Sequence, residues 1–172
     1  MPGAPTPAIV DFVSSAIAVV GVQPPSDIGA HDATVWETVD GGQRWVHYAL
    51  PDSRGGVSGL QFLTATQGWA TTNMEGASAQ EDLVLLHTTT GGRTWTRSPA
   101  SAGVLESPSS KRPSKAIPYD GLKNAPVFAT PSIGWISGST YSNRPVWLGT
   151  VDGGNTWRPS PLPKRFAGIP TR

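Results

Sequence analysis

Apolar and polar positions between residues 57 and 99 form four short segments, separated by polar or glycine-containing breaks. The segments are VSGLQFLT (57–64), GWATT (68–72), LVLLHTT (83–89) and RTWTRS (93–98). Short runs of β-branched, apolar and aromatic residues between such breaks are typical of β-strands. The pattern predicts four successive strands, with a turn at Gln67-Gly68 and a polar loop over residues 73–82.

The end of this pattern occurs three times in the chain. The stretches TVDGGQRW (38–45), TTTGGRTW (88–95) and TVDGGNTW (150–157) align without gaps. Each begins with Thr, has Gly-Gly at its fourth and fifth positions and ends in Trp. We call this eight-residue segment the box.

A second marker precedes each box. Phe stands seven residues before Trp at 62–69 and again at 128–135, and the first copy (12–19) has Val19 in place of Trp. The markers predict three modules, at residues 8–51, 57–99 and 124–163, followed by a tail at 164–172. The counterparts of the polar loop at 73–82 are residues 23–32 in the first module and 139–145 in the third. The Ser-, Pro- and Lys-rich stretch 101–121 is predicted to be a mobile insertion.

Turn-rich repeats of this length point to propeller blades. We therefore predict an all-β fold of three four-stranded antiparallel blades. Three blades do not close a ring, because propellers typically have about four to eight. The chain is then a piece of a larger propeller, or half of a six-bladed ring made by two copies, or an arc capped by its insertion and termini. Val19 slightly favours a natural edge at the first module, since terminal repeats are often atypical.

The residue types of the box suit a hairpin turn. Adjacent glycines supply positive φ at little cost, an Asp before them can accept hydrogen bonds from the turn, and Trp can bury a large apolar area. Thr90 replaces the Asp in the second copy, which fits a turn better than a metal ligand. The structural box residues are Thr38, Asp40, Gly42, Trp45, Thr88, Gly92, Trp95, Thr150, Asp152, Gly154 and Trp157.

The third box resembles the Asp-box, or bacterial neuraminidase repeat, with the pattern S/T-x-D-x-G-x-T-W. Residues 150–157 match it fully, whereas the first copy has Arg44 in place of Thr. Together with the Phe-Trp marker, the chain looks most like the photosystem II assembly/stability factor group and its bacterial relatives. The resemblance implies a propeller with the boxes at its periphery, away from any catalytic centre.

Composition limits the classes of function. The 172 residues include 15% charged ones and carry a formal net charge of +1, which gives no electrostatic reason to expect nucleic acid or an anionic membrane as partner. The chain has no cysteine, no apolar run that could span a bilayer and no recognisable signal peptide at its start. The resemblance nevertheless implies a location outside the cytoplasm.

No catalytic, cofactor-binding or metal-binding residues are predicted. His31, His47 and His87 lack metal-ligand spacing, and no Tyr stands in a recognisable sialidase context. Trp36 and Trp147 precede boxes at offsets that differ by one residue, so alternation predicts that they face opposite sides. They are the candidates for ligand contact.

The sequence favours a non-catalytic protein-binding or scaffold module. One alternative is a fragment of a sialidase-like or other glycoside hydrolase, with its active site on blades outside this chain. Another is a carbohydrate-binding propeller. Self-association, or further blades, is expected to cover the open sheet faces, because large exposed apolar surfaces mark interfaces.

Overall fold

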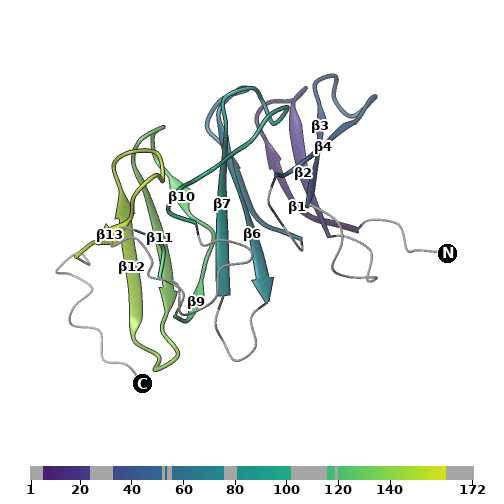
Figure 1. Cartoon of the computed structure of the whole chain (residues 1–172). Helices are drawn as coiled ribbons and strands as arrows, with labels where there is room; N and C mark the ends of the chain where they lie inside the picture. Colours follow the sequence, from purple (N-terminus) through teal and green to yellow (C-terminus); the bar gives the residue numbers. More distant parts are fainter. Residues whose placement is uncertain are drawn as a thin grey trace.

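Three antiparallel sheets, standing side by side in chain order, make up the protein (Figure 1). The structure is a computed structural model. It describes residues 6–23, 33–51, 53, 56–75, 81–101, 116–118 and 120–161. These residues form strands, turns and loops without helix, which confirms the all-β prediction.

Each sheet takes its strands from one stretch of the chain, and we call the sheets blades 1, 2 and 3. Blade 1 contains β1 (Thr6–Phe12), β2 (Ala18–Gln23), β3 (Thr34–Thr38) and β4 (Val46–Ala49). Blade 2 contains β5 (Val57–Phe62), β6 (Gly68–Glu75), β7 (Glu81–Thr88) and β8 (Thr96–Arg97). Blade 3 contains β9 (Leu122–Lys123), β10 (Val127–Phe128), β11 (Gly134–Ser139), β12 (Pro145–Thr150) and β13 (Arg158–Pro159).

Blade 3 has five strands where four were predicted, because its first strand is broken in two. Both β9 and β10 pair with β11, and the backbone of Asn124 between them donates to Ser137 O at 2.8 Å. The first strands of blades 1 and 2 have register shifts at the equivalent place, between Pro7 and Ile9 and between Val57 and Gly59. The first strand of every blade is thus irregular at the same place, and in blade 3 the irregularity is large enough to divide the strand into β9 and β10. It also brings Leu122 and Lys123 into the blade, before the predicted module start at 124.

The predicted loop over residues 73–82 is shorter than expected. Strands β6 and β7 continue into it, and Glu75 pairs with Glu81. Similarly, β11 and β12 extend into the predicted loop at 139–145, as Ser139 pairs with Pro145. Polar side chains in these segments hid the strand ends, because backbone pairing does not require apolar residues.

Two apolar cores lie between the blades. Val35 of blade 1 meets Val57, Leu86 and Trp95 of blade 2 in the first core. Leu85 of blade 2 is part of the second core, together with residues of blade 3. Neighbouring residues of β7 therefore serve different cores, since alternate side chains point to opposite faces of a strand. The run Leu83–Leu86 is fully buried because both faces of the central blade are covered.

The second core also receives a residue from the predicted insertion. Ile117 is 2% exposed and packs between blades 2 and 3. Most of the stretch, 102–115 and 119, lies outside the described residues, as do residues 162–172, which include the whole predicted tail at 164–172. The end of the stretch 101–121 is therefore part of the packed structure.

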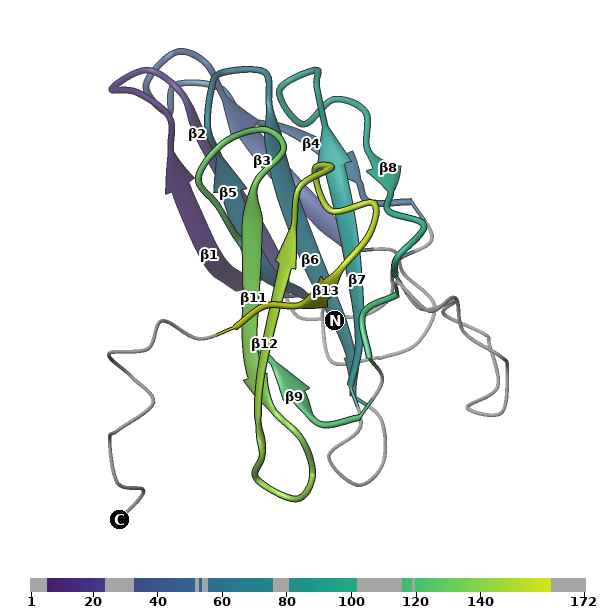
Figure 2. The ribbon, with the colours of Figure 1, turned by 90° about the vertical axis from the view of Figure 1, so that its left-hand side faces the viewer.

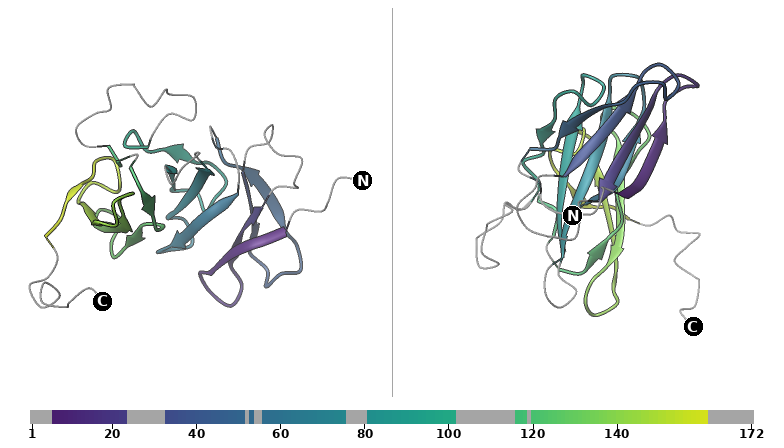
Figure 3. Two further views of the ribbon diagram at one scale, coloured as in Figure 1. Left: turned by 90° about the horizontal axis from the view of Figure 1, so that it is seen from below. Right: turned by 90° about the vertical axis from the view of Figure 1, so that its right-hand side faces the viewer.

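All three boxes lie at the same end of the sheets. They form the β3–β4, β7–β8 and β12–β13 hairpins, at the top of Figures 1 and 2. Seen from below, the blades follow one another with one uncovered outer face at each end of the row (Figure 3, left). Blade 1 has no neighbour before it, and blade 3 has none after it, among the described residues.

Candidate interaction surfaces at the ends of the blade row

The three boxes share one set of hydrogen bonds. The Thr hydroxyls of residues 38, 88 and 150 accept the backbone N–H of Gly42, Gly92 and Gly154 at 2.9 to 3.0 Å. The carbonyls of the same glycines accept the indole N–H of the box Trp at 2.7 to 3.1 Å. Both glycines of every box have positive φ, between 72° and 96°, which a side chain would strain.

Thr90 performs the task of the carboxylate in the second box. The side chains of Asp40 and Asp152 accept the backbone N–H four residues later at 2.9 Å. The Thr90 hydroxyl accepts the Thr94 N–H at the same distance. An acceptor at the third box position is therefore common to all three boxes, whereas a negative charge is not.

These bonds lower the pKa of both box carboxyls. For Asp40, the largest cause is the backbone N–H of Arg44, followed by the Thr38 hydroxyl. For Asp152, partial burial acts to raise the pKa, but hydrogen bonds from the side chain and backbone of Thr156 and from Thr150 outweigh it. Both carboxyls thus accept hydrogen bonds from their own hairpins, as residues that stabilise a turn do.

Aromatic stacking joins blades 2 and 3. The Trp69 indole lies on the Phe128 ring, with centroids 3.9 Å apart and planes 11° apart. Its N–H donates to Gly153 O of the third box at 3.2 Å. Trp69 also stacks on His87, with ring centroids 4.9 Å apart, and burial lowers the pKa of His87.

A side-chain amide fixes the backbone between the same blades. Gln61 precedes Phe62 and reaches across to Phe128, where its oxygen accepts the backbone N–H at 2.7 Å and its NH₂ donates to the carbonyl at 2.9 Å. Asp11 precedes Phe12 and accepts the backbone N–H of Phe62 in the same way. Blades 1 and 2 thus each hold the Phe backbone of the following blade through the residue before their own Phe.

Blades 1 and 2 are joined differently, because Val19 stands where blade 2 has Trp69. Glu37 lies largely buried near the second box, and its Oε2 is 3.9 Å from Arg93 Nε. Burial raises the pKa of Glu37, while the Arg93 charge and a hydrogen bond from Tyr48 act to lower it. Where blades 2 and 3 are joined by the stacking of Trp69 on Phe128, blades 1 and 2 are joined by the buried Glu37 side chain, whose charge Arg93 partly compensates.

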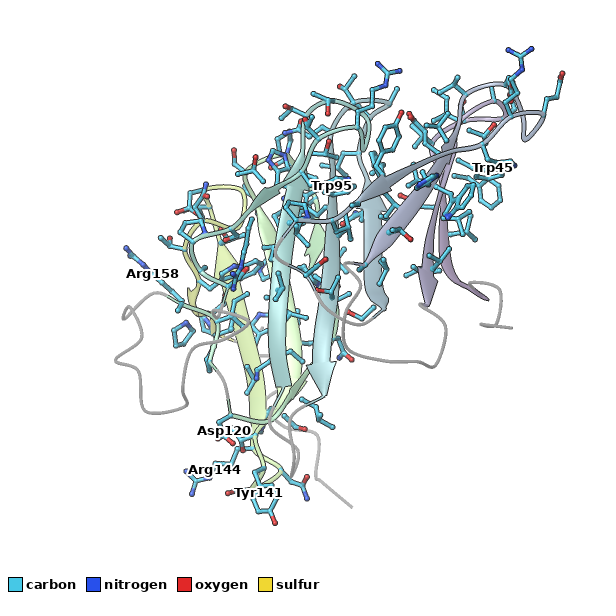
Figure 4. All side chains as sticks on the ribbon, turned by 45° about the vertical axis from the view of Figure 1, so that its right-hand side comes forward. Trp45, Trp95, Asp120, Tyr141, Arg144 and Arg158 are labelled. Atoms are coloured by element: carbon cyan, nitrogen blue, oxygen red, sulfur yellow. The ribbon has the colours of Figure 1, made fainter. Side chains whose placement is uncertain are left out.

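The outer face of blade 1 exposes side chains that are buried in the other blades. Phe12 is 73% exposed, whereas Phe62 and Phe128 are 9% and 2% exposed. Trp45 is 40% exposed, whereas Trp95 and Trp157 are 7% and 2% exposed. Figure 4 shows Trp95 between two blades and Trp45 on the outer side of blade 1. In blades 2 and 3 this Phe and Trp meet edge to face and pack against the preceding blade.

A second difference contributes to the exposure of Phe12. Gly68 and Gly134 lie beneath the rings of Phe62 and Phe128, where a Cβ would come within 2.6 to 2.7 Å of a ring carbon. The equivalent residue in blade 1 is Ala18, which pairs with Phe12. Its methyl group prevents Phe12 from lying against the strand as Phe62 does.

Trp36 and Trp147 lie on the two opposite outer faces. Val35 packs between blades 1 and 2, so Trp36, the next residue, points away from blade 2. There its ring lies tilted by 36° against the His47 ring, with centroids 5.0 Å apart. Leu148 packs between blades 2 and 3, so Trp147 points away from blade 2 on the other side. In blade 2 the residues at these two positions are Leu86 and Leu85, which pack against blades 1 and 3.

Trp135 shares the outer face of blade 3 with Trp147. It pairs with Val127 on β10, and Ser137, two residues on, pairs with Trp147 on β12. Trp135 therefore occupies the position of Trp69, with no following blade to cover it among the described residues. Beside Trp147 is a pocket of about 430 Å³. Its described lining is Pro118, Pro145, Val146, Trp147, Leu148, Pro159 and Ser160.

The opposite end of blade 3 carries an exposed hairpin that was predicted only as a loop. Tyr141 and Arg144 lie at its tip, close to Asp120 (Figure 4). The Asp120 carboxylate accepts the backbone N–H of Tyr141 at 3.3 Å. Asn143 adopts a positive φ of 58° in this turn, a conformation that Asn tolerates better than most residues.

Metal-binding clusters are absent from the part of the chain that the structure describes: no three His, Asp or Glu side chains there are close enough to hold a metal ion. His31 and Tyr119 lie outside the described residues. The structure likewise contains, in its described ranges, no helix with the length and hydropathy of a bilayer span.

Comparison with solved structures supports the propeller architecture. A structure described as "YCF48 bound to D1 peptide" matches with a TM-score of 0.50 and 21% sequence identity. The match covers 90% of this chain and 39% of the YCF48 chain, which is itself a β-propeller. At this identity the likeness concerns the fold alone, and it shows that the three sheets are propeller blades.

The other two comparisons give no match. No model of a known protein family fits the chain, and no curated protein is similar to it. The chain spans about two fifths of the length of the propeller that it matches.

Sequence reasoning missed the residues that connect the blades. Asp11 and Gln61 look like ordinary polar strand residues, and Glu37 and Arg93 lie 56 positions apart in the sequence. The available signal was their position in the repeat: Asp11 and Gln61 both directly precede the marker Phe. Aligning that position would have singled them out.

Proposed function

We propose that the protein is a non-catalytic protein-binding scaffold built from propeller blades. One observation carries the proposal: both outer faces of the blade row present aromatic side chains at positions that form blade–blade contacts inside the protein. Exposed apolar surface of this kind marks protein interfaces. The YCF48 structure, bound to a peptide, gives independent support for protein recognition by such blades.

The pocket beside Trp147 favours a peptide over a sugar. Three prolines and two aliphatic residues line it with Trp147, and Ser160 supplies the one side-chain hydroxyl of the described lining. A sugar site needs several convergent polar groups to orient the hydroxyls, whereas an apolar peptide side chain needs mainly contact area. Carbohydrate binding and glycoside hydrolysis therefore remain the alternatives, in second place.

A random peptide library displayed on phage tests the proposal. We expect selection against the wild-type chain to enrich peptides whose binding is lost in Phe12→Glu or Trp135→Glu. Val151→Glu is the matched control, because the equivalent Thr89 of blade 2 is exposed even between two neighbours. Failure to enrich any peptide, or equal binding to all variants, would contradict protein binding.

Two further assays separate the alternatives. Binding on a glycan array that disappears in Trp36→Ala or Trp147→Ala would establish a carbohydrate-binding propeller instead. Hydrolysis of fluorogenic glycosides by the protein as it is expressed from its own gene would establish a glycoside hydrolase.

We further propose that the boxes place the chain in the Asp-box class and that the protein acts outside the cytoplasm. The support for both is the match of residues 150–157 to the Asp-box pattern and the style of the repeats. Fractionation of cells that express the protein from its own gene tests the location. Recovery with the cytoplasmic fraction would contradict it.

A further inference from the structure

The interface between blades 2 and 3 provides a template for the outer faces. Blade 2 contributes the Trp69 indole and the Ser98 hydroxyl, which donate to Gly153 O and Gly154 O of the third box. Blade 3 contributes the Phe128 ring, on which Trp69 lies. The contact has direction: one blade gives donors and Trp, and the next gives Phe and box carbonyls.

Both halves of this contact are present on the two outer faces. Blade 3 has Trp135 and Ser160 at the positions of Trp69 and Ser98, and Ser160 is held by the same backbone bond, to Trp147 O, that Ser98 makes to Leu85 O. Blade 1 has Phe12 and the carbonyls of Gly41 and Gly42 at the positions of Phe128, Gly153 and Gly154. The first box has the same Thr-to-glycine and Trp-to-glycine hydrogen bonds as the third, and its glycines have φ of 72° and 89° against 73° and 92° in the third.

We propose that the outer face of blade 3 docks on the outer face of blade 1 of a second copy of this chain. Trp135 then covers Phe12 of that copy, and its indole N–H and the Ser160 hydroxyl donate to the carbonyls of Gly41 and Gly42. Two copies related by a two-fold axis form two such contacts. The product is a ring of six blades, within the usual range of propellers.

Two residues make this contact weaker than the internal one. Val127 stands where Gln61 holds the following blade, and a valine cannot make those hydrogen bonds. Ala18 stands where glycine lets the Phe ring lie against the strand. The association is therefore reversible and depends on protein concentration, unlike the fixed order of the blades within one chain.

The inference rests on the proposed function, since it names a second copy of the chain as the protein that binds the two outer faces. Its test is separate from the peptide selection. Light scattering of the whole chain over a concentration series measures the mass. We expect wild type to pass from 18.0 kDa toward twice that value, and Phe12→Glu and Trp135→Glu each to stay monomeric. Val151→Glu should associate like wild type. Thermal unfolding checks that all three variants are folded. We expect Phe12→Glu to fold, because Phe12 is exposed in the wild-type chain.

Mixing the two monomeric variants gives the decisive result. Phe12→Glu retains an intact blade 3 face, and Trp135→Glu retains an intact blade 1 face, so an equimolar mixture should form a dimer with one of each. A mixture that stays monomeric overturns the proposal. So does a wild type that is monomeric throughout, either variant dimerising by itself, or masses that grow beyond two copies. A monomeric wild type that still selects peptides would leave the proposed function standing.

Discussion

The indole of Trp69 lies flat on the ring of Phe128, at 3.9 Å between centroids, and so joins blade 2 to blade 3 through two residues that are far apart in the sequence. The same indole donates to Gly153 O. The Trp69 side chain thus helps to set both the spacing of blades 2 and 3 and their positions relative to each other along the strands.

Replacing Trp69 by alanine should destabilise the protein by about 3–5 kcal/mol, because it opens a large cavity between Phe128 and His87. Trp135→Ala is the matched control, since it removes the same residue at the equivalent position of a blade with no described neighbour. We expect less than about 1 kcal/mol for the control. Urea unfolding at low protein concentration measures both. Equal losses would contradict the interface role assigned to Trp69.

Val127→Gln should strengthen self-association by up to about a thousandfold, because each of the two contacts in the dimer gains two hydrogen bonds. Gln61 makes two hydrogen bonds to the next blade from this position, and a hydrogen bond contributes about 1 kcal/mol net. Sedimentation equilibrium measures the association constant. Val127→Leu, which keeps the side chain apolar, serves as the control. A glutamine variant with the association of wild type would show that the outer faces do not meet as the inner ones do.

Asp152→Ala should cost about 1 kcal/mol at pH 7, because the Thr156 N–H loses its acceptor. Asp152→Thr should retain most of the stability, since Thr90 accepts the same bond in the second box. The pKa of Asp152 is lowered in the folded protein, so its contribution is present above the ordinary carboxyl pKa. The difference from wild type should shrink as the pH falls through the lowered pKa, because the protonated carboxyl is a weaker acceptor than the carboxylate. Chemical unfolding over a pH series tests this, and a difference that is undiminished in acid would contradict it.

Arg93→Met should destabilise the protein by at most about 1 kcal/mol at neutral pH, because Arg93 is mostly exposed and pairs with Glu37 through solvent-screened attraction. The pKa of Glu37 is raised in the folded protein, so its effect on stability depends on pH in the opposite way from that of Asp152. The favourable contribution of Glu37 to folding is present below the ordinary carboxyl pKa and is lost as the pH rises through the raised pKa. Glu37→Gln should therefore gain stability relative to wild type as the pH rises.

A double-mutant cycle isolates this pair. In the Glu37→Gln background, Arg93→Met should have no effect at any pH, because the charge that Arg93 compensates is gone. An equal effect of Arg93→Met in both backgrounds would assign its role to packing.

The sequence predicted the architecture because the repeated residues act locally. Gly41 and Gly42 determine a turn by their own backbone freedom, and Thr38 and Trp45 bond within the same hairpin. Nothing distant is needed to interpret them. The alternation around Trp36 and Trp147 placed them on opposite sides for the same reason.

The contacts between blades were not predictable in this way. Gln61 acts on Phe128, 67 positions later, and no local pattern distinguishes it from a solvent-exposed glutamine. The burial of Ile117 depends on how the end of a Pro- and Ser-rich stretch returns to the sheets. Strand ends such as Glu75 and Glu81 were missed because ladder hydrogen bonds form through the backbone, whatever the side chain.

One backbone hydrogen bond recurs at the box end of every blade: the N–H groups of Gly41, Gly91 and Gly153 donate to Ala16, Thr66 and Ser132 O at 2.8 to 3.0 Å. Each bond joins two hairpins of one blade and never crosses to a neighbour. A gene segment that encodes one blade therefore carries this closure with it when it is duplicated. The number of blades can then change during evolution without substitutions at the box end of the blade. Only the few residues that contact the neighbouring blade must change.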